Sequence, residues 1–166
     1  MEAPQVPTLS AEDEARMIAA LGQVFDLARH GDAPALAALI ARGMPPNLRN
    51  EKGDSLAMLA AYHGHVDALR TLLDAGASPD QRNAMGQTPI AGAAYKGFKE
   101  IIELLLAHGA DVEGASPDGR TALMTAAMFQ RTDIVDLLRA HGANPDARDS
   151  RGMTAADAAA FMAGRR

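Results

Sequence analysis

The sequence predicts an all-α solenoid in which short helix–turn–helix units stack in one row. Glycine recurs every 33 residues in two registers, at Gly53, Gly86, Gly119 and Gly152 and at Gly43, Gly76, Gly109 and Gly142. A period held in two registers indicates repeated copies of one structural unit. Aromatic residues make up only 4% of the chain although 48% of it is hydrophobic, so the core consists mainly of small side chains. Such side chains suit close contact between helices.

Each element of the unit follows from its residues. The first glycine permits a tight turn, and a hydroxyl residue two positions later caps the helix that follows. These hydroxyl residues are Ser55, Thr88, Thr121 and Thr154. An alanine pair then lets this helix approach a second helix, whose leucines and isoleucines recur at helical spacing. The second glycine ends the second helix, and neighbouring copies must stack to cover its apolar face.

These residues resemble the ankyrin repeat, a 33-residue unit with the motif T-P-L-H-x-A and a closing LL-x-x-GA segment. Residues 86–111, GQTPIAGAAYKGFKEIIELLLAHGAD, form the closest copy. The resemblance implies an ankyrin-repeat solenoid of about four to five repeats with β-turn fingers. We expect a loose tail over 1–9 and a single domain over 10–166. Within that domain, 10–49 forms a capping helix and divergent repeat, 50–82, 83–115 and 116–148 form full repeats, and 149–166 forms a capping half repeat.

The chain departs from the family motif at identifiable positions. The histidine of T-P-L-H is replaced in every copy, by Met58, Ala91, Met124 and Asp157. We therefore expect packing to replace the hydrogen bonds that this histidine makes in the family. Gln130 stands where an inter-helix glycine is usual, which predicts a less regular junction there.

The composition narrows the classes of function. The formal net charge of −5 disfavours nucleic acid and anionic membranes as partners, because both attract basic surfaces. The chain has no cysteine and no predicted membrane span, and its first residues do not resemble a secretion signal. We expect a monomeric cytoplasmic protein without a cofactor. No catalytic motif is evident, so we expect a protein that is not an enzyme.

A metal site is a weaker alternative. His30 and His63 occupy equivalent positions in adjacent copies, as do His108 and His141. Stacked helix pairs lie roughly 10 Å apart, which is too far for adjacent histidines to share a zinc ion with bonds of about 2 Å. We expect these residues to follow the repeat, and His65 to be a polar surface residue at the start of a second helix.

The residues before the inter-helix glycine are the leading candidates for partner binding, because the family resemblance implies that they face the concave side. Four of the six aromatic residues fall there, and aromatic side chains and methionine are typical of buried interface centres. The candidates are Tyr62, His63, Tyr95, Lys96, Met128, Phe129 and Phe161. The alternative is that some of these side chains pack between repeats, and a purely structural cap or a piece of a larger assembly would bury the whole row. We expect Phe25 and Phe98 to be core or staple residues.

The turn tips add a basic edge to this predicted face. Arginine recurs at Arg49, Arg82 and Arg148, in the same position of three copies. Other candidates at the tips are Lys52, Met85, Arg120 and Arg151. A basic edge favours a partner protein with an acidic or mixed apolar surface. We predict a non-enzymatic module that binds a partner protein and acts by occupancy, with a metal- or ligand-binding regulator around His30 and His63 as the alternative.

Overall fold

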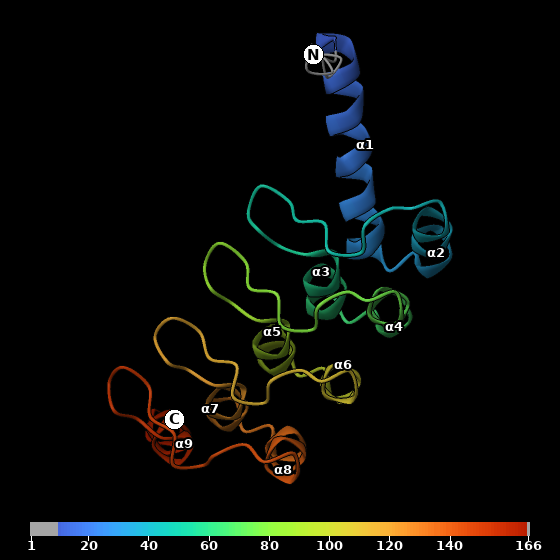
Figure 1. Cartoon of the computed structure of the whole chain (residues 1–166). Coiled ribbons are helices and arrows are strands. Elements are labelled where there is room, and N and C mark those ends of the chain that lie inside the picture. Colours follow the sequence, from blue (N-terminus) through green and yellow to red (C-terminus); the bar gives the residue numbers. More distant parts are fainter. Residues whose placement is uncertain (1–9, 166) are drawn as a thin grey trace, which may run out of the picture.

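The computed structural model describes residues 10–165, which form two parallel rows of helices (Figure 1). The inner row consists of α1 (Ala11–His30), α3 (Leu56–Tyr62), α5 (Pro89–Lys96), α7 (Ala122–Met128) and α9 (Ala155–Ala163). The outer row consists of α2 (Ala33–Ala41), α4 (Val66–Asp74), α6 (Lys99–Ala107) and α8 (Thr132–Ala140). The predicted all-α solenoid is confirmed. The tail expected over residues 1–9 lies outside the described residues.

Loops that we call fingers connect each outer helix to the next inner helix, and they project on the side away from the outer row (Figure 1). The first finger is closed by an isolated bridge between Arg49 and Ser55. Adjacent fingers are joined by backbone hydrogen bonds: the Ala84 amide donates to the Lys52 carbonyl at 3.0 Å, and the Ser150 amide donates to the Asp118 carbonyl at 2.7 Å. We call the surface that the fingers and the inner helices form together the concave face.

The predicted hydroxyl caps begin the inner helices. Ser55 Oγ accepts a hydrogen bond from the Met58 amide at 3.0 Å, and the equivalent bond to Thr121 Oγ is 3.2 Å long. In α9 the cap is reciprocal, because Asp157 also accepts from the Thr154 amide at 2.9 Å. These bonds to the backbone and hydroxyl of Thr154 lower the pKa of Asp157. The aspartate that replaces the family histidine thus caps the last helix.

The residues that replace the family histidine in the other three copies differ in burial. Met58 and Met124 are buried, whereas Ala91 is half-buried. The alanine pairs pack without accessible surface in α3 and α5, where they allow the close contact between helices that the sequence predicts. Phe25 is buried and Phe98 packs against the core, in agreement with the sequence analysis.

A side chain from the following repeat leans over each inter-helix glycine. His65 covers Gly31 so closely that a Cβ atom on this glycine would lie 2.5 Å from His65 Cγ. His65 is half-buried, and its Nε2 donates a hydrogen bond to the Arg29 carbonyl at 2.7 Å. The expectation that His65 is a simple surface residue is therefore wrong, because its ring joins two repeats.

Gln130 keeps the backbone conformation of the glycine that it replaces. Its φ of 56° lies in the same left-handed region as Gly64 and Gly97, so the junction is more regular than the sequence suggested. Phe98 leans over Gly64 and Arg131 leans over Gly97, but the residue one repeat after Arg131 is Gly164, which has no side chain. Space for the Gln130 side chain therefore remains at the last junction.

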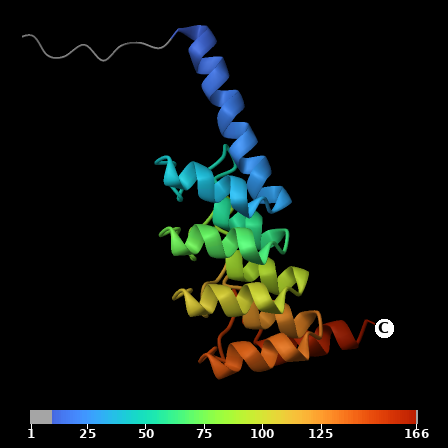
Figure 2. The same ribbon diagram turned by 90° about the vertical axis from the view of Figure 1, so that its right-hand side faces the viewer.

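The N-terminal half of α1 extends beyond the stack (Figure 2). Ser10 caps this helix as predicted, with the Asp13 amide donating to Ser10 Oγ at 3.1 Å. Ile18, on the projecting part, is 65% exposed. Between residues 10 and 165, no helix combines the length and the apolar character needed to cross a membrane.

Candidate partner-binding face

Four exposed aromatic side chains lie at or near the C-terminal ends of successive inner helices. We call them the aromatic strip. They are Tyr62, Tyr95, Phe129 and Phe161, which are 40%, 51%, 38% and 49% exposed. The structural alternative required these rings to be buried between repeats, and they are not. Large aromatic side chains exposed in a row form an apolar surface of the kind that partners cover.

The rings of the aromatic strip contact one another or a cation. Tyr95 and Phe129 meet edge to face with their centroids 5.3 Å apart. Lys96 Nζ lies 4.9 Å from the centre of the Tyr62 ring, and the Arg165 guanidinium lies 4.6 Å from that of Phe161. Such contacts orient the rings without burying them.

Three hollows follow one another between the aromatic strip and the fingers, with volumes of about 510, 410 and 170 Å³. The first lies between Tyr62, His63 and Met85, and the third between Met128 and Phe161. The middle hollow is bounded by Tyr62, Tyr95 and Phe129, and Gly92 forms part of its lining. The hollows place inner-helix residues and finger residues on one continuous surface.

The recurring arginines bind the fingers themselves. Arg82 Nη1 donates to the Gly86 carbonyl at 2.8 Å and also to the carbonyl of Ala115 in the next copy. Arg49 repeats this arrangement, with one bond to Gly53 at 3.1 Å and a second to the Arg82 carbonyl. These guanidinium groups are therefore engaged in joining repeats, a role that the sequence analysis did not anticipate.

Arg148 in the last finger makes the corresponding bond within its own turn, to the Gly152 carbonyl at 2.7 Å. The third copy has Ala115 in the arginine position, so the series is interrupted there. Because these arginines stabilise the fingers, the basic edge is less available to a partner than the sequence indicated.

Among the other predicted finger residues, Arg151 is exposed and Arg120 is half-buried. Lys52 and Met85 are exposed, and Met85 is 70% exposed. Arg120 lies 3.7 Å from the Asp118 carboxylate, and Arg151 lies 3.3 Å from that of Asp149. Both carboxylates accept further bonds from their own turns, and the pKa of each is lowered. Arg120 and Arg151 are thus held at the surface rather than buried.

The histidines of the concave side contact other groups of the fold. The rings of His63 and His65 stack with centroids 6.4 Å apart, and His30 Nδ1 lies 2.8 Å from the carbonyl of Asp26 in its own helix. Partial burial, His65 and Lys96 lower the pKa of His63, which favours a neutral ring. Over residues 10–165, no three histidine, aspartate or glutamate side chains gather as a metal site would require.

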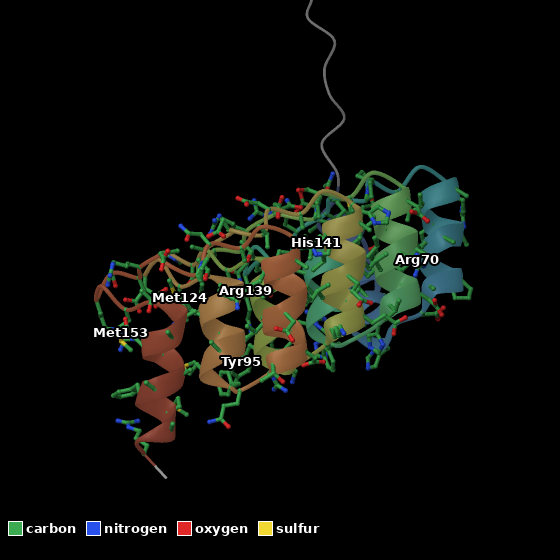
Figure 3. The ribbon with its side chains drawn as sticks, turned by 90° about the horizontal axis from the view of Figure 1, so that it is seen from below. Arg70, Tyr95, Met124, Arg139, His141 and Met153 are labelled. Carbon is green, nitrogen blue, oxygen red and sulfur yellow. The ribbon has the colours of Figure 1, made fainter. Side chains whose placement is uncertain are left out.

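The outer face has a different character. His108 Nε2 lies 2.9 Å from Asp74 Oδ1, and His108 Nδ1 lies 3.0 Å from the Leu104 carbonyl. Because both partners are acceptors, this geometry favours the doubly protonated ring, and the bond to Asp74 is the main reason that the pKa of His108 is raised. Figure 3 separates the two faces: Arg70, Arg139 and His141 lie over the outer helices, whereas Met124 and Met153 lie toward the fingers.

Sequence reasoning missed several residues of the concave face. Gly92 was not among the predicted site residues, although a glycine inside a helical pattern usually has a structural or functional role. The cations Arg131 and Arg165 were also missed, and the guanidinium of Arg131 lies 6.0 Å from the centre of the Phe129 ring. Arg131 was missed because it lies in the turn between α7 and α8, and the spacing of the repeat does not indicate its contact with Phe129.

The helix pairs, fingers and concave face define a solenoid of ankyrin type, and comparison with known proteins agrees. A family model described as ankyrin repeats in three copies matches residues 24–114, and a model of a single ankyrin repeat matches residues 118–150. The chain belongs to the ankyrin repeat family, whose repeats are generally protein–protein interaction modules and typically lack enzymatic activity.

A curated relative is similar over a shorter segment. It is named as an ankyrin repeat protein, PA3287, from Pseudomonas aeruginosa, and it is 62% identical over 40 residues. The match covers 24% of this chain and 23% of the relative. This chain therefore spans less than a quarter of that relative, and the similarity extends over about one repeat.

Proposed function

We propose that this ankyrin repeat protein binds another protein through the aromatic strip and the adjoining fingers, and that it acts by occupying its partner without catalysis. The observation that carries the proposal is the exposure of four aromatic rings in one row. Aromatic anchors bury a large area at a modest cost in conformational entropy, which makes them frequent centres of interfaces. Met85 and Met128, on the same surface, provide flexible apolar contacts.

The partner surface that fits this face is apolar at its centre and acidic at its edges. Lys96, Arg131 and Arg165 each lie over a ring of the aromatic strip, and Lys52, Arg120 and Arg151 lie along the fingers. Cations around an apolar centre attract and orient a surface with complementary carboxylates. No specific observation favours the metal- or ligand-binding alternative around His30 and His63.

The experiment is a quantitative pull-down from a lysate of the source organism with three forms of the protein. The first is the wild type, and the second carries Tyr62→Ala, Tyr95→Ala and Phe129→Ala. The third is a matched control on the outer face, Arg70→Ala with Arg139→Ala, which removes two exposed side chains of comparable size. Circular dichroism establishes that all three forms are equally folded.

We expect a protein that the wild type and the outer-face control retain and that the triple variant loses. Aromatic anchors at an interface centre each contribute at least about 2 kcal/mol, so the loss from three of them exceeds 100-fold in affinity. Equal retention by the triple variant, or loss only in the outer-face control, would show that the partner binds elsewhere on the molecule.

A further inference from the structure

Gly92 occupies the interior of α5, where glycine is unfavourable for the helix. Its backbone has ordinary helical geometry, unlike the positive φ of the turn glycines. A Cβ atom at this position would meet one atom within 4 Å, Tyr62 Cδ2 at 3.3 Å, and Tyr62 is an exposed side chain. Neither backbone conformation nor close approach of another helix therefore requires glycine here.

The other inner helices carry a side chain at the equivalent position. These residues are Asp26, Leu59, Thr125 and Ala158, and Leu59 and Thr125 are buried. At Gly92 the missing side chain contributes to the middle hollow, of about 410 Å³, between the rings of Tyr62, Tyr95 and Phe129. The floor and the aromatic walls of this hollow thus come from three successive repeats.

The middle hollow is lined mainly by apolar and aromatic residues, which include Met58 and Met128. Thr88, Thr125, Gln87 and Arg120 are polar members of the same lining. Arg120 is the charged member of this lining. An apolar hollow walled by aromatic rings suits a single large apolar side chain, and the adjacent guanidinium suits a carboxylate next to that side chain.

The charges around all three hollows favour an anionic occupant. Five cations belong to the lining: Arg29, Lys52, Arg120, Arg151 and Arg165. Three of them also lie beside a carboxylate, Arg29 beside Asp26, Arg120 beside Asp118 and Arg151 beside Asp149. The carboxylates are Asp54 and Asp149, and both already accept hydrogen bonds from neighbouring side chains, Asp54 from Asn83 and Asp149 from Arg151. Because the whole chain carries a net charge of −5, this cationic lining is a local property of the concave face.

We propose that the middle hollow is an anchor pocket, which receives one large apolar side chain from an acidic peptide segment of the partner. Gly92 keeps the pocket open, the rings of Tyr62, Tyr95 and Phe129 enclose the anchor, and Arg120 binds a carboxylate beside it. This inference rests on the proposed function, and it adds the place and the chemistry of the central contact.

The probe is a library of random twelve-residue peptides displayed on phage and selected on the wild-type protein. We expect the selected peptides to share one leucine, methionine or phenylalanine with aspartate or glutamate close to it. One such peptide, labelled with a fluorophore, is then titrated by fluorescence anisotropy against the wild type and Gly92→Leu. Leucine fills the pocket, so the affinity should fall at least tenfold.

The controls separate filling of the pocket from damage to the fold. Ala107→Leu introduces the same leucine side chain at an exposed position of α6 and should leave the affinity unchanged. Gly92→Ala favours the helix, so its thermal midpoint should be no lower than that of the wild type while its affinity for the peptide falls. Replacing the anchor residue of the peptide by alanine should weaken its binding to the wild type. The same replacement should change its already weak binding to Gly92→Leu only slightly.

The outcomes distinguish this inference from the proposed function. Peptides that bind Gly92→Leu as tightly as the wild type, but lose binding to the triple variant of the aromatic strip, would overturn the anchor pocket and leave the concave face as the binding surface. Peptides that bind all of these variants equally would overturn both, as would a library that yields no binder. A shared apolar anchor without acidic neighbours would overturn the acidic character of the segment.

Discussion

The arginines of the fingers offer a direct test of how the repeats are joined. Arg82 donates to one carbonyl in its own finger and to the carbonyl of Ala115 in the next copy. Replacing Arg82 by alanine removes both bonds and leaves two carbonyl groups that water can reach. Because stability in a repeat array depends on each interface between neighbours, the loss should appear in the unfolding of the whole stack.

The magnitude follows from the exposure of these bonds. A hydrogen bond to a charged group contributes about 1.5–3 kcal/mol when it is protected from solvent. Arg82 is exposed, so competition with water reduces the two bonds together to a net contribution of about 1–2 kcal/mol. At about 2–4 °C per kcal/mol for a chain of this size, Arg82→Ala should lower the thermal midpoint by about 2–8 °C.

The reverse change tests the same reasoning. Ala115 occupies the arginine position of the third copy, where an arginine has the Gly119 and Arg148 carbonyls at the equivalent places. Ala115→Arg should therefore raise the free energy of unfolding by about 1 kcal/mol. Urea unfolding measures both variants, with Arg70→Ala on the outer face as a control that changes stability by less than about 0.5 kcal/mol. Unchanged free energy of unfolding in both Arg82→Ala and Ala115→Arg would refute the structural role of these arginines. Partner binding would then again be the interpretation of the recurring arginines.

Two further predictions concern the turns and the outer face. Gly53→Ala places a Cβ atom 2.7 Å from the Ala84 amide nitrogen at a φ of 74°, whereas Gly152→Ala has nothing within 4 Å at a φ of 76°. The left-handed backbone should lower the free energy of unfolding of both variants by about 1 kcal/mol. Urea unfolding should show a further loss of at least about 1 kcal/mol in Gly53→Ala. Equal losses in the two variants would contradict the contact between fingers. The pKa of His108 is raised chiefly by Asp74, so this pair stabilises the fold fully below about pH 6.5 and less as the pH rises through the raised pKa. Asp74→Asn should therefore reduce stability more at pH 5.5 than at pH 8.5, and a reduction independent of pH would contradict the assignment.

The repeat was predictable because its determinants are local. The turn glycines, the hydroxyl caps and the alanine pairs act within a few residues, and the period fixes how the copies stack. The positions of the aromatic strip follow from that same register, which is why the exposure of Tyr62 and Tyr95 agrees with the sequence analysis. The assignment of these rings to partner binding stays a prediction.

The remainder depends on contacts between copies that the sequence of a single copy does not show. Arg82 was predicted as part of a basic edge for a partner, but it extends across one repeat and binds the Ala115 carbonyl. His65 was predicted at the surface, but the absence of a side chain at Gly31 lets its ring pack over the preceding repeat. The hollow at Gly92 arises from rings in three copies, so the glycine alone did not indicate it.

A partner that covers the aromatic strip should protect its rings from oxidation, and hydroxyl-radical footprinting of the complex with a captured partner measures this protection. Tyr62, Tyr95, Phe129 and Phe161 are exposed and should therefore react in the free chain, so their oxidation can be compared residue by residue with and without the partner. We expect protection of Tyr62, Tyr95 and Phe129, with His108 and His141 on the outer helices oxidised equally in both states. Protection of the outer histidines while the three rings stay reactive would contradict this expectation.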